Sequence, residues 1–122
     1  MNDHGSNPLP QQYGDARCTV EVSYDGTTAI VTVTGEADQG TAPALGAGIE
    51  EAISHQPDRA VIDLLGVSFL ASAAIRELIV GHRALGDRFV VVAGNRNTVR
   101  PLVELALDRL FRVVGNMADA TA

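Results

Sequence analysis

The chain has 122 residues, of which 46% are hydrophobic, with a formal net charge of −6 and a mean hydropathy of +0.11. This size and apolar content predict one globular domain with a single core, and no apolar run approaches the ~18 residues of a membrane span. The negative charge argues against direct binding of nucleic acid and against binding to anionic membrane surfaces.

The two ends of the chain are expected to lie outside the folded domain. Residues 1–16 are rich in Pro, Gly, Gln and Asn and lack the basic start and apolar middle of a secretory signal, so we predict a disordered N-terminal tail. The domain is predicted over residues 17–116, and residues 117–122 are predicted to form a C-terminal tail. Without a secretory signal or a membrane span, the protein is expected in the cytoplasm.

Cysteine usage and the distribution of charge limit the chemistry further. The single cysteine, Cys18, cannot form an internal disulfide or a zinc pattern and is expected to be a small buried strand residue. Residues 1–63 carry ten acids and two arginines, a balance of −8, whereas residues 64–122 carry five acids and seven arginines, a balance of +2. The chain has no lysine, and an arginine-only basic face suits the carboxylates or phosphates of a partner.

The first elements in chain order are two strands and a helix. Apolar and polar residues alternate over residues 18–24 and 28–34 with an Asp-Gly turn between them, which predicts an antiparallel pair. Apolar residues at helical spacing then predict a helix over residues 38–54. Gly46 and Gly48 inside it each cost about 1 kcal/mol relative to alanine, so we expect close approach to a neighbouring strand.

The middle of the chain predicts a central strand and a second helix. A nearly continuous apolar run over residues 60–65 is typical of a strand covered on both faces. Residues 72–85 form the second helix, and its buried stripe includes His82, which we expect to be a core or boundary residue with satisfied hydrogen bonds. His55, at the end of the first helix, is expected to interact favourably with the helix dipole.

The last third of the chain predicts a strand, a helix and a final strand. Residues 89–93 indicate another covered strand, a helix capped by Asn97 or Thr98 follows, and residues 110–114 can form one more strand or lie against the sheet. The order ββαβαβα(β) predicts an α/β domain with a single layer of mixed β-sheet, about four to five strands, and helices packed on it.

No enzyme chemistry is indicated by these patterns. None of the three histidines has a Ser, Cys or Asp at a spacing that indicates a catalytic triad. The turn that follows residues 89–93, Ala-Gly-Asn-Arg-Asn, lacks both glycine-rich phosphate-binding fingerprints. We therefore expect no catalytic residue, no metal site and no cofactor.

Three motifs in order resemble those of STAS domains, over residues 18–115. Residues 32–45 (TVTGEADQGTAPAL) resemble the opening "G-E-L-D…T-A-P-x-L", residues 63–70 (DLLGVSFL) resemble the strand "D-L-x-x-V-x-F", and residues 107–113 (LDRLFRV) resemble the tail "G-L-D-R-L-F". Ala106 stands where the family commonly has the glycine of that tail. The relatives that this pattern indicates are the single-domain bacterial anti-sigma-factor antagonists.

The resemblance implies a STAS fold and a switch in transcription regulation. In that family the partner is an anti-sigma factor that is also a serine-protein kinase, and it phosphorylates a serine after the third strand, which here matches Ser72. The unmodified antagonist binds this partner and frees the sigma factor, and the phosphorylated antagonist is released. A weak homodimer is left open. The residues expected to contact the partner are Asp38, Thr41, Ala71, Ser72, Ala73, Ala74, Arg76 and Val80.

The loop around Ser72 departs from the family pattern and leaves alternatives open. The family usually has D-S-S-G, whereas residues 71–74 are Ala-Ser-Ala-Ala, without the acid before the serine or the glycine after the serines. Ser72 is therefore either a phosphoacceptor or only the N-cap of the helix. Asp38 can likewise cap the first helix, and Arg76 and Val80 can be solvated surface. The alternative function is a phosphorylation-independent STAS scaffold subunit of a sensory or lipid-transport assembly.

Overall fold

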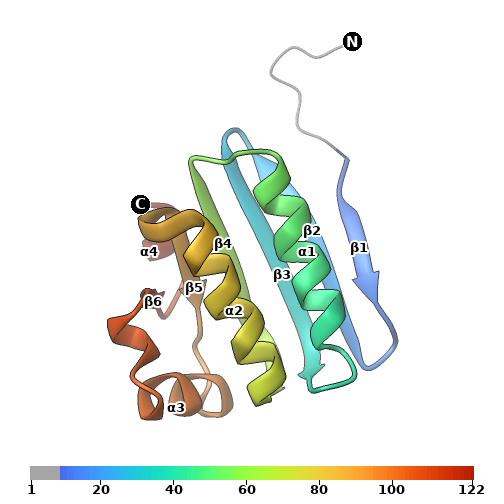
Figure 1. The fold of residues 1–122 in the computed structure, drawn as a ribbon, viewed down its shortest axis with the longest axis vertical. Helices are drawn as coiled ribbons and strands as arrows, with labels where there is room; N and C mark the ends of the chain where they lie inside the picture. The colour runs from blue at the N-terminus through green and yellow to red at the C-terminus, as the bar shows by residue number, and fades with distance from the viewer. Residues whose placement is uncertain (1–8) are drawn as a thin grey trace.

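The computed structural model describes residues 9–122, which fold around one mixed β-sheet (Figure 1). Its strands are β1 (Gln11–Gly14), β2 (Cys18–Asp25), β3 (Thr28–Ala37), β4 (Arg59–Leu70), β5 (Phe89–Val92) and β6 (Arg112–Val114). They lie side by side in sequence order, with β1, β2 and β3 antiparallel and β3 to β6 parallel. The predicted α/β class and single mixed sheet are confirmed, with six strands in the described residues rather than four to five.

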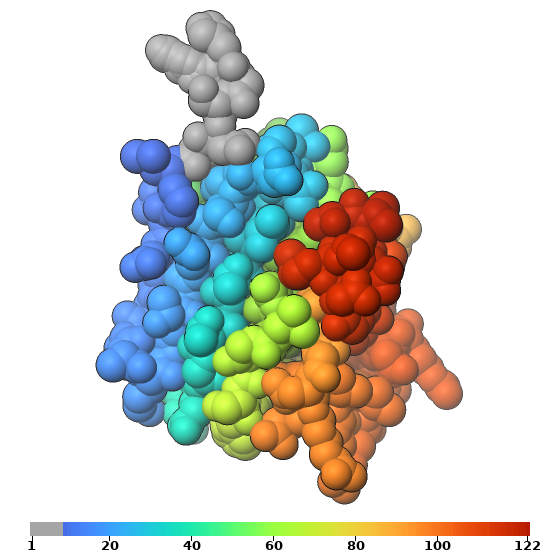
Figure 2. All heavy atoms as spheres, turned by 180° about the vertical axis from the view of Figure 1, so that it is seen from behind, coloured from blue at the N-terminus to red at the C-terminus, as the bar shows by residue number. Residues whose placement is uncertain are grey.

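Helices cover both faces of this sheet. The helices of the described residues are α1 (Ala42–Ser54), α2 (Ser72–Leu85), α3 (Arg96–Glu104) and α4 (Met117–Thr121), with 3-10 turns η1 (Gly86–Arg88) and η2 (Leu107–Arg109). α1 and α2 lie side by side on one face, and α3 lies near the end of α2 at which that helix begins (Figure 1). α4 packs on the opposite face, where Figure 2 shows the C-terminal segment in red.

The main core fills the space between the sheet and the α1–α2 layer. Cys18 is 1% exposed within it, as predicted for a buried strand residue. The expected close approach is confirmed at Gly48, because a Cβ there would lie 2.6 Å from the side chain of Val20 on β2. Gly46 differs from this expectation, since a Cβ there would instead meet the Glu77 carboxylate on α2. Gly48 therefore allows α1 to approach β2, whereas Gly46 leaves room for the Glu77 side chain of α2.

Both predicted tails contain regular structure. Residues 11–14 form β1 and pair with β2, so the prediction of a disordered segment over residues 1–16 is wrong there; residues 1–8, with His4, lie outside the described part. Most of the predicted tail over residues 117–122 is α4, whose Ala120 is fully buried. These segments carry too few apolar side chains to show a periodic pattern, and tertiary contacts hold them.

The central strand β4 is longer than the apolar run predicted, because two bulges interrupt its alternation. The pairing with β3 shifts register after Thr32 and again after Gly35. From Leu64 onward, burial therefore follows every third residue, at Leu64, Val67 and Leu70. β4 ends at Leu70, and the single residue Ala71 connects it to α2.

The third helix begins earlier than predicted, and an unusual backbone conformation follows it. Asn95 is the N-cap rather than Asn97 or Thr98, since its side chain accepts a hydrogen bond from the Thr98 N–H at 3.1 Å. Ala106 has φ of +58°, in the left-handed region that favours glycine. This is the position at which a glycine is commonly found in proteins with the resembling motif.

We predict that Ala106→Gly raises the free energy of unfolding by about 0.5–1 kcal/mol, because glycine removes the left-handed strain at a small cost in unfolded-state entropy. Urea unfolding followed by circular dichroism measures this change. The control is Ala47→Gly inside α1, where the same substitution is expected to destabilise by about 1 kcal/mol. A decrease at Ala106 as large as that of the control contradicts the prediction.

Candidate functional site

Ser72 is the first residue of α2 and follows β4 through a single connecting residue. That residue, Ala71, has extended backbone, and its N–H donates to the carbonyl oxygen of Ala37 at the end of β3 (2.9 Å). The Ile75 N–H donates to the carbonyl of Ala71 (3.0 Å) and closes the first helical turn. The Ser72 side chain is exposed. The connection is therefore held by backbone hydrogen bonds that leave the hydroxyl accessible.

Ser72 does not cap α2. The N-cap position belongs to Ala71, and α2 has neither a side-chain cap nor an acidic residue in its first turn. The N–H groups at this end of the helix, with the positive end of the helix dipole, thus lie close to the Ser72 hydroxyl without a side-chain acceptor. The alternative role of Ser72 as an N-cap is wrong for this conformation.

A second polar feature, the turn between β3 and α1, lies beside the Ser72 connection. The Thr41 hydroxyl, which is buried, donates to the carbonyl of Glu36 (2.8 Å) and accepts from the Asp38 N–H (2.9 Å). The Asp38 carboxylate accepts from the Thr41 N–H (3.0 Å). Thr41 is the N-cap residue of α1, so Asp38 stabilises the turn before the helix rather than capping the helix itself.

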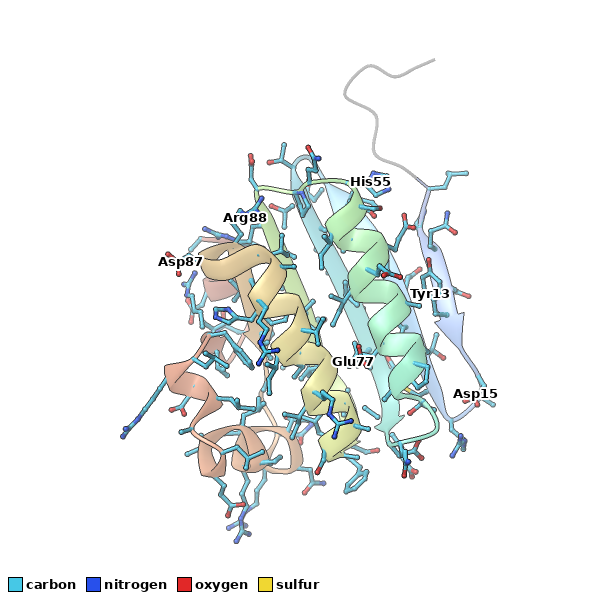
Figure 3. All side chains as sticks on the ribbon, in the orientation of Figure 1. Tyr13, Asp15, His55, Glu77, Asp87 and Arg88 are labelled. Carbon is cyan, nitrogen blue, oxygen red and sulfur yellow. The ribbon has the colours of Figure 1, made fainter. Side chains whose placement is uncertain are left out.

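Hydrogen bonding and one cation control the charge of Asp38. The Thr41 hydroxyl shares its proton between the Glu36 carbonyl and the Asp38 Oδ1, which is 3.0 Å away, and this hydrogen bond is the main cause that holds the pKa of Asp38 below its usual range. Arg17 adds an ion pair, with Nη1 3.0 Å from the Asp38 Oδ2. Arg17 comes from the β1–β2 turn, as does Asp15 in Figure 3, and the sequence pattern gave no reason to connect this turn to Asp38.

The predicted contact residues on α2 divide into an outer and an inner set. Ser72, Arg76 and Val80 follow one another at intervals of four, so they form one exposed stripe along the helix, with Val80 51% exposed. Ala74 is fully buried, and so is the Thr41 side chain. Neither of these two can offer its side chain to a partner in this conformation, which corrects their assignment as contacts.

The other predicted residues lie between these two sets. Ala71 and Ala73 are half-buried, and Asp38 is partly exposed beside them in the turn before α1. The hydrogen bond from Ala71 to Ala37 joins the two segments directly. The structure therefore places the predicted residues of the Asp38 turn and of the Ser72 connection at one edge of the sheet.

His55 and His82 lie outside this surface. Nδ1 of His82 is buried without a hydrogen-bond partner, so the expectation of satisfied hydrogen bonds is wrong. The ring packs against Phe89 and Phe111. His55 is the C-cap residue of α1, and its ring binds the Glu51 carboxylate at 3.0 Å.

Among residues 9–122, no group of three or more His, Cys, Asp or Glu could hold a metal ion, and no helix is long and apolar enough to cross a membrane.

Comparison with known proteins identifies the family. A family model described as "Mlab, STAS domain" matches residues 20–115. The chain belongs to the STAS domain family. This STAS domain is 36% identical over 104 residues to the anti-sigma-F factor antagonist RsfB of Mycobacterium tuberculosis, a match that covers 84% of this chain and 85% of RsfB.

Solved structures agree with this assignment. An anti-sigma factor antagonist from Mycobacterium paratuberculosis is 35% identical, with a TM-score of 0.81 over 85% of this STAS domain and 91% of that chain. The phosphorylated form of SpoIIAA, a Bacillus cell fate determinant, is 15% identical with a TM-score of 0.58, covering 91% of this chain and 96% of that one. At this identity the second likeness shows the fold alone, and it confirms the predicted STAS fold.

We predict that Asp38 contributes to the acid sensitivity of this STAS domain. Because its pKa is lower in the folded chain than in the unfolded chain, its stabilisation is complete above about pH 4 and is lost as pH falls below that value. In Asp38→Asn the melting temperature should therefore fall less between about pH 5 and about pH 2.5 than in the wild type.

Thermal unfolding across this pH range measures the effect of Asp38→Asn. Asp87→Asn, an exposed carboxylate on η1, makes the same change in charge and serves as the control. An equal acid-induced loss of stability in the wild type and in Asp38→Asn would show that the Asp38 turn does not depend on the carboxylate charge.

Proposed function

We propose that this STAS domain is an anti-sigma-factor antagonist that binds a serine-kinase anti-sigma factor and is released when Ser72 is phosphorylated. RsfB, 36% identical, and the Mycobacterium paratuberculosis protein, 35% identical, both carry the name of anti-sigma factor antagonist. The observation that carries the proposal is the exposed Ser72 hydroxyl at the beginning of α2, in a connection whose hydrogen bonds do not use it. Binding of the anti-sigma factor by the unmodified domain would free the sigma factor and so regulate transcription.

The physical basis of the switch is a change of surface charge. A phosphate on Ser72 adds about −1.5 to −2 charge and three strong acceptor oxygens. The nearby helix N–H groups can stabilise this charge, so the fold is retained. A partner that contacts the Ser72 connection, by contrast, meets new bulk and negative charge in its interface. Like charges brought together at an interface weaken binding, so the phosphorylated form dissociates.

The surface that would contact the partner has two parts beside Ser72. One is the exposed stripe of α2, where Arg76 offers a cation and Val80 an apolar side chain. The other is the Asp38 turn, which its hydrogen bonds to Thr41 hold in a fixed conformation. A preordered surface of this kind loses little conformational entropy when it binds.

Fold relatives support a switch that leaves the fold intact. One solved structure is of SpoIIAA of Bacillus in its phosphorylated form, and another is of SpoIIAA in its unphosphorylated form. Their TM-scores to this chain are 0.58 and 0.52. Both forms share the fold of this domain. We therefore expect phosphorylation here to change binding and not architecture.

The second candidate function is a phosphorylation-independent scaffold subunit of a sensory or lipid-transport assembly. The loop at residues 71–74, which lacks the usual acid and glycine, favours it. In this case Ser72 would be ordinary surface, and the partner would recognise the stripe of α2 regardless of phosphorylation.

We predict that incubation with ATP and the serine-kinase anti-sigma factor of the same genome adds one phosphate, at Ser72, and that Ser72→Ala abolishes it. Intact-mass measurement followed by peptide mapping checks the site. Ser72→Glu should weaken binding of the anti-sigma factor about tenfold or more, which calorimetry measures. Ser68 on β4 provides matched controls, because it is also exposed; Ser68→Ala should keep the phosphate and Ser68→Glu the affinity.

The same experiment separates the two functions. Phosphate at a residue other than Ser72 would refute the site. Unchanged affinity in Ser72→Glu together with lost affinity in Arg76→Glu would support the scaffold, because the partner then depends on the α2 surface and not on the state of the serine.

A further inference from the structure

A groove runs between α1 and α2 on the outer surface of the helical layer. Its volume is about 460 Å³. Its apolar lining includes Ile49 and Ile53 from α1 and Val80 and Ala84 from α2. Two carboxylates, Glu50 on α1 and Glu77 on α2, also line it, and no cation does. The groove thus combines an apolar surface with negative charge.

The position of Glu77 depends on a glycine in the facing helix. Because Gly46 has no side chain, the Glu77 carboxylate lies over α1 at this point; a Cβ on Gly46 would be 2.5 Å from the Glu77 Oε1. Figure 3 shows Glu77 between the two helices. Gly46 therefore opens the space that the acidic side chain occupies.

Neither carboxylate is paired with a cation of residues 9–122. Four ion pairs form among residues 9–122, and neither Glu50 nor Glu77 belongs to any of them. Glu77 is half-buried, and a carboxylate beside apolar surface is stabilised by a cation that enters the same low-dielectric environment. The groove is thus complementary in charge to a basic partner.

The groove is also continuous with the surface around Ser72. Pro43, in the first turn of α1, lines it and follows the Asp38 turn directly. At its other wall, Val80 belongs to both the groove and the exposed stripe of α2. A partner that contacts Ser72 can therefore extend along the groove without a gap.

We propose that this groove binds a basic amphipathic helix of the partner protein. A third helix can pack in the depression between two neighbouring helices, as amphipathic helices do in other apolar grooves. Its apolar side chains would cover Ile53, Val80 and Ala84, and its Arg or Lys side chains would pair with Glu50 and Glu77. The inference rests on the proposed function, because the helix belongs to the same partner that Ser72 controls.

The test uses a synthetic probe, so that it does not depend on a kinase or on ATP. The basic probe is an 18-residue helical peptide with leucines on one face and arginines on the other, and the acidic probe has glutamate in place of each arginine. Amide chemical shifts of the full chain are followed by NMR during titration. The basic peptide should shift amides of α1 and α2 around the groove, whereas the acidic peptide should not.

Charge-neutralising variants then test the two carboxylates. Glu77→Gln and Glu50→Gln should each weaken binding of the basic peptide roughly three- to tenfold. Glu104→Gln on α3 removes the same charge in an exposed ion pair outside the groove and should change the affinity less than about twofold. Melting temperatures confirm that each variant is folded.

Several outcomes would overturn the inference. Equal binding of the acidic peptide, shifts confined to another face, or affinity unaffected by both variants would each do so. Analytical ultracentrifugation at the NMR concentration tests whether a second copy of the chain occupies the groove. A dimer that Glu77→Gln dissociates would assign the groove to that second copy and overturn the inference. If the basic peptide binds the groove but the kinase adds no phosphate at Ser72, the switch is refuted and the groove is kept, so the two proposals fail separately.

Discussion

One hydrogen bond between strand ends sets the layout of the candidate site. The N–H of Ala71, which follows β4, donates to the carbonyl of Ala37, the last residue of β3. These strands are parallel, so both chain segments leave the sheet at the same edge, and each leads into a helix on the same face. The Asp38 turn and Ser72 therefore meet in space, although α1 and all of β4 separate them in the sequence.

In this layout the exposed surface around Ser72 is separate from the buried core that holds α2 on the sheet. Ala74, Ile75 and Leu78 are buried and hold α2 on the sheet, whereas Ser72 points away from them. Charge added to an exposed hydroxyl acts on whatever contacts that surface and little on the packing below it. A change of binding without a change of fold is therefore the simplest consequence of this architecture.

Sequence patterns predicted the fold where the backbone is regular. The bounds of α2, residues 72–85, and the alternating burial in β2 and β3 agree with the patterns. β4 was predicted too short, because its two bulges replace alternating burial with burial at every third residue. β1 and α4 were missed because pairing with β2 and burial of Ala120 hold them, and neither contact has a local signature.

The position of Ser72 was predictable, but the contacts around it were not. Arg17 reaches Asp38 from a distant turn, and no spacing in the sequence indicates that pair. Residue 71 is alanine where the family usually has aspartate, so the beginning of α2 has neither a side-chain cap nor an acid in its first turn. An aspartate before the serine would compete with a phosphate for the same N–H groups and repel it. The loop of this chain leaves the positive helix end to the phosphate, so its departure from D-S-S-G is compatible with phosphorylation at Ser72.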